Sequence, residues 1–127
     1  MRKTILLSLA TMVLSACATT YAQPVNNRPT YDRFMANHHQ DRKHYRHQMD
    51  RYYGRDRQSV VQHFGRPDTK INEGHGLVKL VYKRTKSREF RDGWYKLSCK
   101  TVFRTKHGVV NDVKVVGNNC TDRFMVG

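Results

Sequence analysis

The sequence has 127 residues, of which 24 are Lys or Arg and only 10 are Asp or Glu, so its formal charge at pH 7 is +14. A chain of this length forms one small domain, which excludes architectures with several large cores. The excess of positive charge indicates anionic partners but does not identify them.

The first seventeen residues have the pattern of an export signal. A short positive start is followed by an apolar run from Ile5 to Leu14 and then by Leu-Ser-Ala-Cys, which ends at Cys17. The run is shorter than the roughly 20 residues of a membrane-spanning helix. A plain secretory cleavage site at Ser15 or Ala22 is the alternative. The Leu-Ser-Ala-Cys segment closely resembles the lipobox of bacterial lipoproteins.

That resemblance implies removal of residues 1–16, a diacylglycerol on the Cys17 sulfur and acylation of its new amino group. Several acyl chains anchor a protein far more firmly than one. Ala18 stands where an Asp would resemble an inner-membrane retention signal, so the expected location is the outer membrane, with the domain facing the periplasm. There the anionic partners are lipid head groups, lipopolysaccharide, wall polymers or acidic proteins, and not nucleic acid.

The cysteine count predicts one disulfide. With Cys17 assigned to lipid, Cys99 and Cys120 are the remaining pair in an oxidising compartment. The alternative is two free thiols or a thiol redox site, but the sequence has no Cys-x-x-Cys spacing. A bridge closing a loop of this length is worth roughly 3 kcal/mol in the chain-entropy model.

Residues 17–30 are small and polar, with two prolines, and are expected to form a lipidated tether. Residues 31–53 follow with an apolar and aromatic stripe at helical spacing, between positions rich in Arg, Lys and His. The stripe consists of Tyr31, Met35, His38, Arg42, Tyr45, Met49 and Tyr52. This pattern predicts a basic amphipathic helix. Three alternatives are open for this segment: its stripe packs on the domain, the helix docks on anionic lipid or in a partner groove, or the segment is disordered.

Residues 54–127 are expected to form an α+β domain. A helix capped by Asp56 or Ser59 ends at Phe64, before Gly65 and Pro67. Strands are expected at 77–83, 94–104 and 109–116, with a charged connection at 84–93 and a turn that ends at Gly108. The predicted fold class is therefore α+β, with two helices packed on a three-stranded antiparallel sheet.

This order of elements resembles the SmpA/OmlA (BamE-like) family of outer-membrane lipoproteins. The resemblance rests on short segments that cover about half of the chain. They are Ser59-Val60-Val61-Gln62-His63-Phe64-Gly65-Arg66-Pro67, Leu80-Val81-Tyr82, Val102-Phe103 and Gly108-Val109-Val110. Leu80 stands where the family has Trp. The resemblance implies a role in the β-barrel assembly machinery. The architecture also resembles the repeat unit of secreted β-lactamase inhibitor proteins, and small lipoproteins of this kind occur in secretion machines.

No enzymatic motif is present: the sequence lacks a Gly-x-Ser-x-Gly elbow, a phosphate-binding glycine loop and a His-Glu-x-x-His helix. Asp41, His44 and His47 share helical spacing, but a zinc site needs three or four convergent ligands. We therefore expect no catalytic residues, no metal and no cofactor.

The expected function is that of a non-enzymatic accessory or scaffold protein in an envelope complex. The alternatives are a module that binds anionic lipid or wall polymer and an inhibitor-like binder of a periplasmic enzyme. Two sets of contact residues are predicted. Binding of an anionic partner is expected at Arg42, Lys43, Arg46 and Arg51, and a specific partner contact at the sheet edge or at Tyr82 and Trp94. A core position is the alternative for these two aromatic residues, and more so for Tyr82. Trp94 is expected to be the more exposed of the two aromatic residues.

Overall fold

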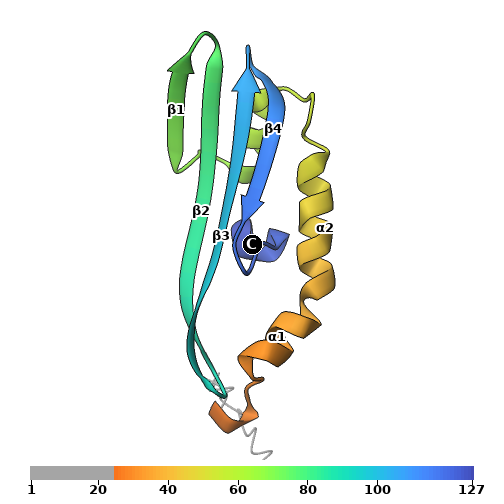
Figure 1. Cartoon of the computed structure of the whole chain (residues 1–127), viewed down its shortest axis with the longest axis vertical. Helices are drawn as coiled ribbons and strands as arrows, with labels where there is room; N and C mark the ends of the chain where they lie inside the picture. Colours follow the sequence, from red (N-terminus) through yellow and green to blue (C-terminus); the bar gives the residue numbers. More distant parts are fainter. Residues whose placement is uncertain (1–24) are drawn as a thin grey trace, which may run out of the picture.

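The computed structural model describes residues 25–127, and it is an α+β fold built on an antiparallel sheet (Figure 1). The predicted signal peptide, the lipid-attachment residue Cys17 and the first part of the tether lie outside the described residues. Between residues 25 and 127 no helix is both long and apolar enough to cross a membrane. The elements in chain order are η1 (Val25–Asn27), α1 (Tyr31–Asn37), α2 (His39–Asp50), α3 (Arg57–Phe64), β1 (Thr69–Gly74), β2 (Leu77–Phe90), β3 (Gly93–Lys106), β4 (Val109–Val116) and α4 (Asp122–Met125).

The sheet is a meander of four strands in the order β1-β2-β3-β4. Strands β2 and β3 pair along their whole length, from Leu77 opposite Lys106 to Phe90 opposite Gly93. Strand β1 pairs with β2 only up to Val81, and β4 pairs with β3 only as far as Lys100. The sheet is therefore four strands wide at one end and narrows to a two-stranded hairpin at the other (Figure 1).

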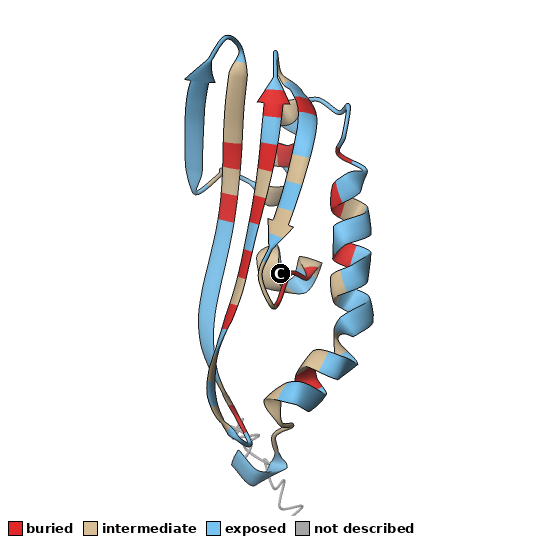
Figure 2. Cartoon of the chain, viewed as in Figure 1, coloured by how far each residue is buried: buried red, intermediate tan, exposed pale blue. Residues whose placement is uncertain are grey.

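The prediction of three strands was wrong, because β1 occupies a stretch expected to be a loop. All six residues of β1 are exposed, so no alternation of apolar and polar residues marks the strand in the sequence. Strand β2 also runs seven residues beyond its predicted end at Lys83. From Lys83 to Arg88 its residues are exposed on both faces (Figure 2), and hydrophobic periodicity is again missing.

The predicted helix over residues 31–53 consists of two helices that meet at His38. His38 leaves helical geometry, with φ −105° and ψ 11°, and its N–H donates to the Phe34 carbonyl. The predicted stripe faces the sheet: Tyr45, Met49 and Tyr52 are buried in the main core. Of the alternatives for this segment, the structure shows a helix whose apolar side packs on the domain, so that side is not available to a membrane.

The main core lies between one face of the wide end of the sheet and helices α2 and α3. Phe103 of β3, Leu80 of β2 and Val60 of α3 are fully or almost fully buried there. The α3 prediction is confirmed: the Asp56 side chain accepts from the Gln58 N–H, and the helix ends at Phe64 before Gly65, whose φ is +79°. A second, smaller cluster at the hairpin end contains Phe34, Phe90 and Leu97.

Candidate functional site

Among residues 25–127, no strand pairs with one edge of β2 in the part of the β2–β3 hairpin beyond the wide sheet. On the side of β3, residues 118 and 119 cover the corresponding edge, since the Ser98 N–H donates to the Asn118 side chain and the Asn119 N–H donates to the Ser98 carbonyl. On the side of β2 the edge from Lys83 onward is exposed (Figure 2). An exposed strand edge presents unpaired main-chain donors and acceptors.

Four cationic side chains lie on this edge: Lys83, Arg84, Lys86 and Arg88. Side chains alternate between the two faces of a strand. Because Tyr82 and Phe90 face the helices, Arg84, Lys86 and Arg88 are on the helix side. The Arg88 guanidinium lies 4.8 Å from the centre of the Phe34 ring and 5.3 Å from that of Phe90.

A cavity of about 480 Å³ opens beside this edge, between the hairpin and helices α1 and α4. Its apolar lining comes mainly from Phe34, Leu97 and Phe124. Its charged lining is cationic only, without a carboxylate: the lining residues are Pro29, Phe34, His38, Lys86, Arg88, Leu97, Asn119, Thr121, Arg123 and Phe124. The cavity thus combines apolar walls with positive charge, which suits an anionic group attached to an apolar body.

The face of the sheet turned away from the helices is a second cationic surface. By strand alternation it carries seven cations, with a hollow of about 260 Å³ around Val102 at its centre. These cations are Lys79, Lys83, Lys96, Lys100, Arg104, Lys106 and Lys114. Lys79 lies 3.8 Å from the Glu73 carboxylate. Trp94 is on the same face, close to the hairpin tip.

The predicted anionic-partner residues, three on α2 and Arg51 at its C-terminal cap, divide into two pairs. The Arg42 guanidinium donates to the Met35 carbonyl at 2.7 Å, and that of Arg46 donates to the Val115 carbonyl at 3.0 Å. These two side chains therefore tie α2 to α1 and to β4. Lys43 and Arg51 are exposed. The structure does not gather the four residues into one binding surface.

The two predicted contact aromatics differ sharply in exposure. Trp94 is 68% exposed, as expected, whereas Tyr82 is only 4% exposed. The Tyr82 hydroxyl donates to the Gly65 carbonyl at 2.8 Å, and burial raises the pKa of Tyr82 to about 12. Tyr82 is a core residue, so its assignment as a partner contact was wrong.

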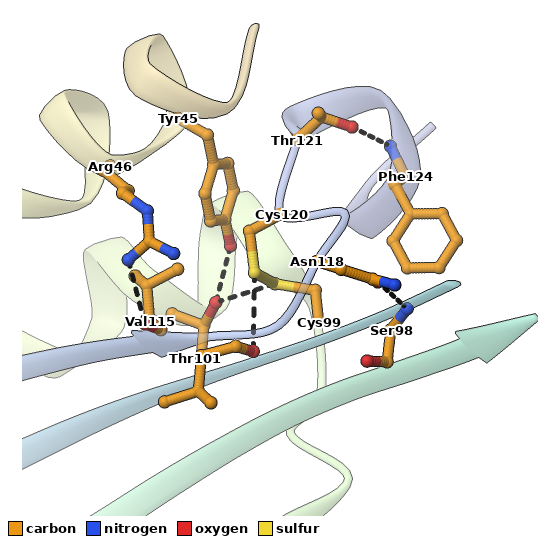
Figure 3. The surroundings of a disulfide bond; sticks show 11 residues. Tyr45, Arg46, Ser98, Cys99, Thr101, Val115, Asn118, Cys120, Thr121 and Phe124 are labelled. Atoms are coloured by element: carbon orange, nitrogen blue, oxygen red, sulfur yellow. Dashed lines mark hydrogen bonds between the residues drawn. A yellow bond between two sulfur atoms is a disulfide. The ribbon is translucent and has the colours of Figure 1, made fainter. Parts of the chain in front are cut away.

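The Cys99–Cys120 disulfide is formed, as the cysteine count predicts. It ties the segment after β4 to β3 at the point where the sheet narrows (Figure 3). Beside it, the Tyr45 and Thr101 hydroxyls are 2.7 Å apart, and burial raises the pKa of Tyr45 to about 12. The bridge lies in the buried core, as a structural disulfide does.

The histidine-rich helix contributes to another cavity, of about 500 Å³, lined by His38, Asp41 and His44 together with residues of the C-terminal segment. His47 is not in its lining. Within residues 25–127 no three His, Cys, Asp or Glu side chains converge as a metal site requires.

The last residues of the predicted tether are bound to the hairpin tip. The Arg28 guanidinium lies 3.3 Å from the Glu89 carboxylate, the Arg91 N–H donates to the Pro29 carbonyl, and the Tyr31 N–H donates to Asp92. Residues 28–30, which were expected to belong to the tether, are therefore part of the folded structure. The chain enters the domain at the same end as the open edge of β2.

Sequence reasoning named a sheet edge as a possible contact, but it missed that residues 83–89 form the open edge, and it missed the four cations and the cavity beside it. The one signal for a longer hairpin was Asp92-Gly93 between aromatic positions, a typical turn pair. The cations themselves indicated a solvated connection. In comparisons with known proteins, no family model, no curated protein and no solved structure matches this chain.

Proposed function

We propose that the protein is a non-enzymatic outer-membrane lipoprotein, anchored through Cys17 and facing the periplasm, which serves as an accessory or scaffold subunit of an envelope protein complex. A complex that assembles outer-membrane proteins, as for the SmpA/OmlA (BamE-like) family, is the specific case. The support from the sequence is the lipobox-like segment and the family-like motifs of the domain.

The observation that carries this proposal is the attachment of residues 28–31 to the hairpin tip. Eleven residue steps separate Cys17 from Arg28, so the chain between them spans at most about 40 Å. A lipid on Cys17 would therefore keep the hairpin end near the membrane surface. Strand β2, at about 3.3 Å per residue, extends roughly 46 Å from that end. The wide end of the sheet can then reach into the periplasm.

The test is a pull-down of the lipidated protein from its native envelope in mild detergent, before and after a high-salt wash. A Cys17→Ser chain is the matched control. Incorporation of labelled palmitate that depends on Cys17, together with a defined set of co-purifying envelope proteins that survives the salt wash, is the expected result. Absence of palmitate incorporation contradicts the anchor, and absence of specific protein partners contradicts the scaffold role.

The outer sheet face favours a second candidate function, binding of anionic lipid or wall polymer. Its seven cations lie on an open surface, where their attraction to polyanions is screened by salt. Sedimentation with phosphatidylglycerol vesicles or with wall polymer would detect it. Replacing Lys96, Lys100 and Lys114 by Gln should then abolish binding. Replacing Lys43 of α2 and Arg51 at its C-terminal cap should leave most of the binding.

A further inference from the structure

We propose that the free edge of β2 between Lys83 and Glu89 binds an extended, acidic segment of a partner protein, which pairs with β2 as an additional strand. The inference rests on the proposed scaffold function and names the kind of partner that the scaffold holds. The added strand lies end to end with β1, which occupies the first part of the same edge.

Hydrogen bonds at both ends of the free edge show which of its main-chain groups point outward. At the near end, the Asp68 N–H donates to the Val81 carbonyl at 2.9 Å, and the Lys83 N–H donates to the Asp68 carboxylate at 2.7 Å. At the far end, the Arg28 guanidinium donates to the Glu89 carbonyl at 3.5 Å. These contacts show that Val81, Lys83 and Glu89 direct main-chain groups away from β3.

The peptide groups of alternate residues in a strand point in the same direction. Thr85 and Ser87, which lie between Lys83 and Glu89, therefore also direct their N–H and C=O groups outward. Among the described residues, none forms a hydrogen bond with these outward groups. The edge thus offers a ladder of about four main-chain hydrogen bonds, enough to hold a short peptide strand.

The charge of the edge selects the partner. In the part of the chain that the structure describes, no ion pair involves Lys83, Arg84, Lys86 or Arg88. A second copy of this chain would bring the same four cations against them, and like charges directly opposite each other destabilise a strand pair. A strand with carboxylates opposite these positions is instead stabilised by electrostatic attraction to the four cations.

Cations on an edge strand often only prevent unwanted pairing, and then they extend into solvent. Here Arg88 lies over the Phe34 and Phe90 rings and, with Lys86, lines the 480 Å³ cavity. The positive charges of Lys86 and Arg88 therefore lie beside the apolar lining of the cavity, which can accommodate a side chain of the added strand. We infer a segment with acidic residues at alternate positions on the helix side and at least one apolar side chain directed into the cavity.

The probe is a synthetic peptide, acetyl-Thr-Glu-Thr-Val-Thr-Glu-Thr-amide, which places two Glu and one Val on the same strand face, added to the lipidated protein in non-ionic detergent micelles. Amide hydrogen exchange, measured by NMR, reports on Thr85 and Ser87 directly. We expect at least tenfold slower exchange of these two amides in the presence of peptide. A peptide of the same charge with alternate N-methyl amides, which cannot form the ladder, should give no protection. Equal protection by the N-methylated peptide would overturn the strand pairing.

Two variants test the chain itself. Ser87→Pro removes an outward N–H without removing a bond to β3, and it should weaken peptide binding at least tenfold. Lys86→Glu with Arg88→Glu should abolish binding. The matched control is Lys43→Glu on α2 with Arg51→Glu at its C-terminal cap, which changes the net charge equally and should change the affinity less than threefold. Equal weakening by the control pair would show that only net charge matters and would overturn the proposal.

Vesicles of phosphatidylglycerol provide the remaining comparison. If they protect Thr85 and Ser87 while the peptide does not, the edge binds a lipid surface and the proposal is wrong. The outcome of the peptide-binding experiment can be distinguished from the outcome of the pull-down. Peptide binding without a captured envelope complex contradicts the scaffold function and leaves the strand-binding edge standing, whereas a captured complex without peptide binding contradicts the edge alone.

Discussion

The wide end of the sheet and its hairpin end differ in how much of each strand is covered. At the wide end, β3 lies between two neighbouring strands and beneath two helices, and Phe103, Tyr45 and Val60 are completely buried. At the hairpin end, two strands pack against the short helices α1 and α4, and the cluster contains three buried residues. Within the described residues, the chain therefore concentrates its apolar burial at one end and its open, exposed edge at the other (Figure 2).

This division indicates that stability and binding are located in different parts of one small domain. The main core does not depend on the hairpin end for its packing. The hairpin end can therefore carry exposed main-chain groups and cationic side chains that form no ion pair among the described residues. Regions with few buried contacts open more readily than the core does. A partner that adds a strand to the hairpin would therefore stabilise the end of the molecule that opens more readily.

Truncation of one large side chain at each end tests this division most strongly. Phe103→Ala removes a fully buried ring from the main core, and a loss of about 3–5 kcal/mol in the free energy of unfolding is expected. Phe90→Ala removes an equally buried ring from the small cluster. It should mainly accelerate amide exchange in residues 83–98 and change the urea midpoint less. A loss of the same size for both variants, with uniform exchange, would show that the two ends unfold as one unit.

Reduction of the disulfide should have the next largest effect. Cys99 and Cys120 are 21 residues apart, and opening a loop of this size costs roughly 3 kcal/mol through the entropy of the unfolded chain. Urea unfolding with and without reductant measures the loss. A Cys99→Ala, Cys120→Ala variant should show no further response to reductant. Reaction of either thiol with a labelling reagent in the denatured, unreduced protein would contradict the bridge.

The sequence predicted the wide end better than the hairpin end, for a physical reason. The α3 bounds, the strand Val109–Val116 and the disulfide were predictable because burial, capping and cysteine pairing leave local signals. In the turn before that strand, His107 and Gly108 have φ angles of +50° and +80°, as a tight hairpin turn requires.

The candidate site has no local sequence pattern from which it could be predicted. Lys83 to Arg88 has the composition of a solvated loop, and only pairing with β3 makes it a strand. Likewise, β1 is held by its pairing with β2 and not by burial of its own side chains. The cavity beside the edge brings together Pro29, Arg88 and Phe124, which are distant in the sequence, so no local pattern could reveal it.

Alkaline pH should weaken the wide end in particular. Burial raises the pKa of Tyr45 and of Tyr82 from 10.0 to about 12. Between these values the unfolded chain loses the phenolic protons while the folded chain keeps them, so stability that is fully present below pH 10 is lost as the pH rises toward 12. At pH 11 the loss from Tyr45 alone is about 1 kcal/mol. Urea unfolding of Tyr45→Phe should show a smaller pH dependence than that of the unmodified chain, and an unchanged dependence would contradict this assignment.

The smallest expected effect concerns the hairpin tip, where Asp92 fixes the start of α1. Its carboxylate accepts the Tyr31 N–H at 3.0 Å and the Tyr95 hydroxyl at 3.1 Å. The bond from Tyr31 holds the pKa of Asp92 below its usual value. This contribution is therefore present above the unfolded-state pKa and is lost as the pH falls through the lower pKa of the folded state.

Asp92→Asn removes this charge at a helix N-terminus, where a negative group is favourable. We expect severalfold faster exchange of the Tyr31 amide, with no measurable change in the urea midpoint of the main core. Asp112→Asn is the matched control, since Asp112 accepts from Tyr53 at the wide end. If Asp92→Asn lowers the urea midpoint while the Tyr31 amide stays protected, the hairpin tip is coupled to the core more tightly than its few contacts imply. The open edge of β2 would then be a rigid platform, and binding of a strand there would add little to its stability.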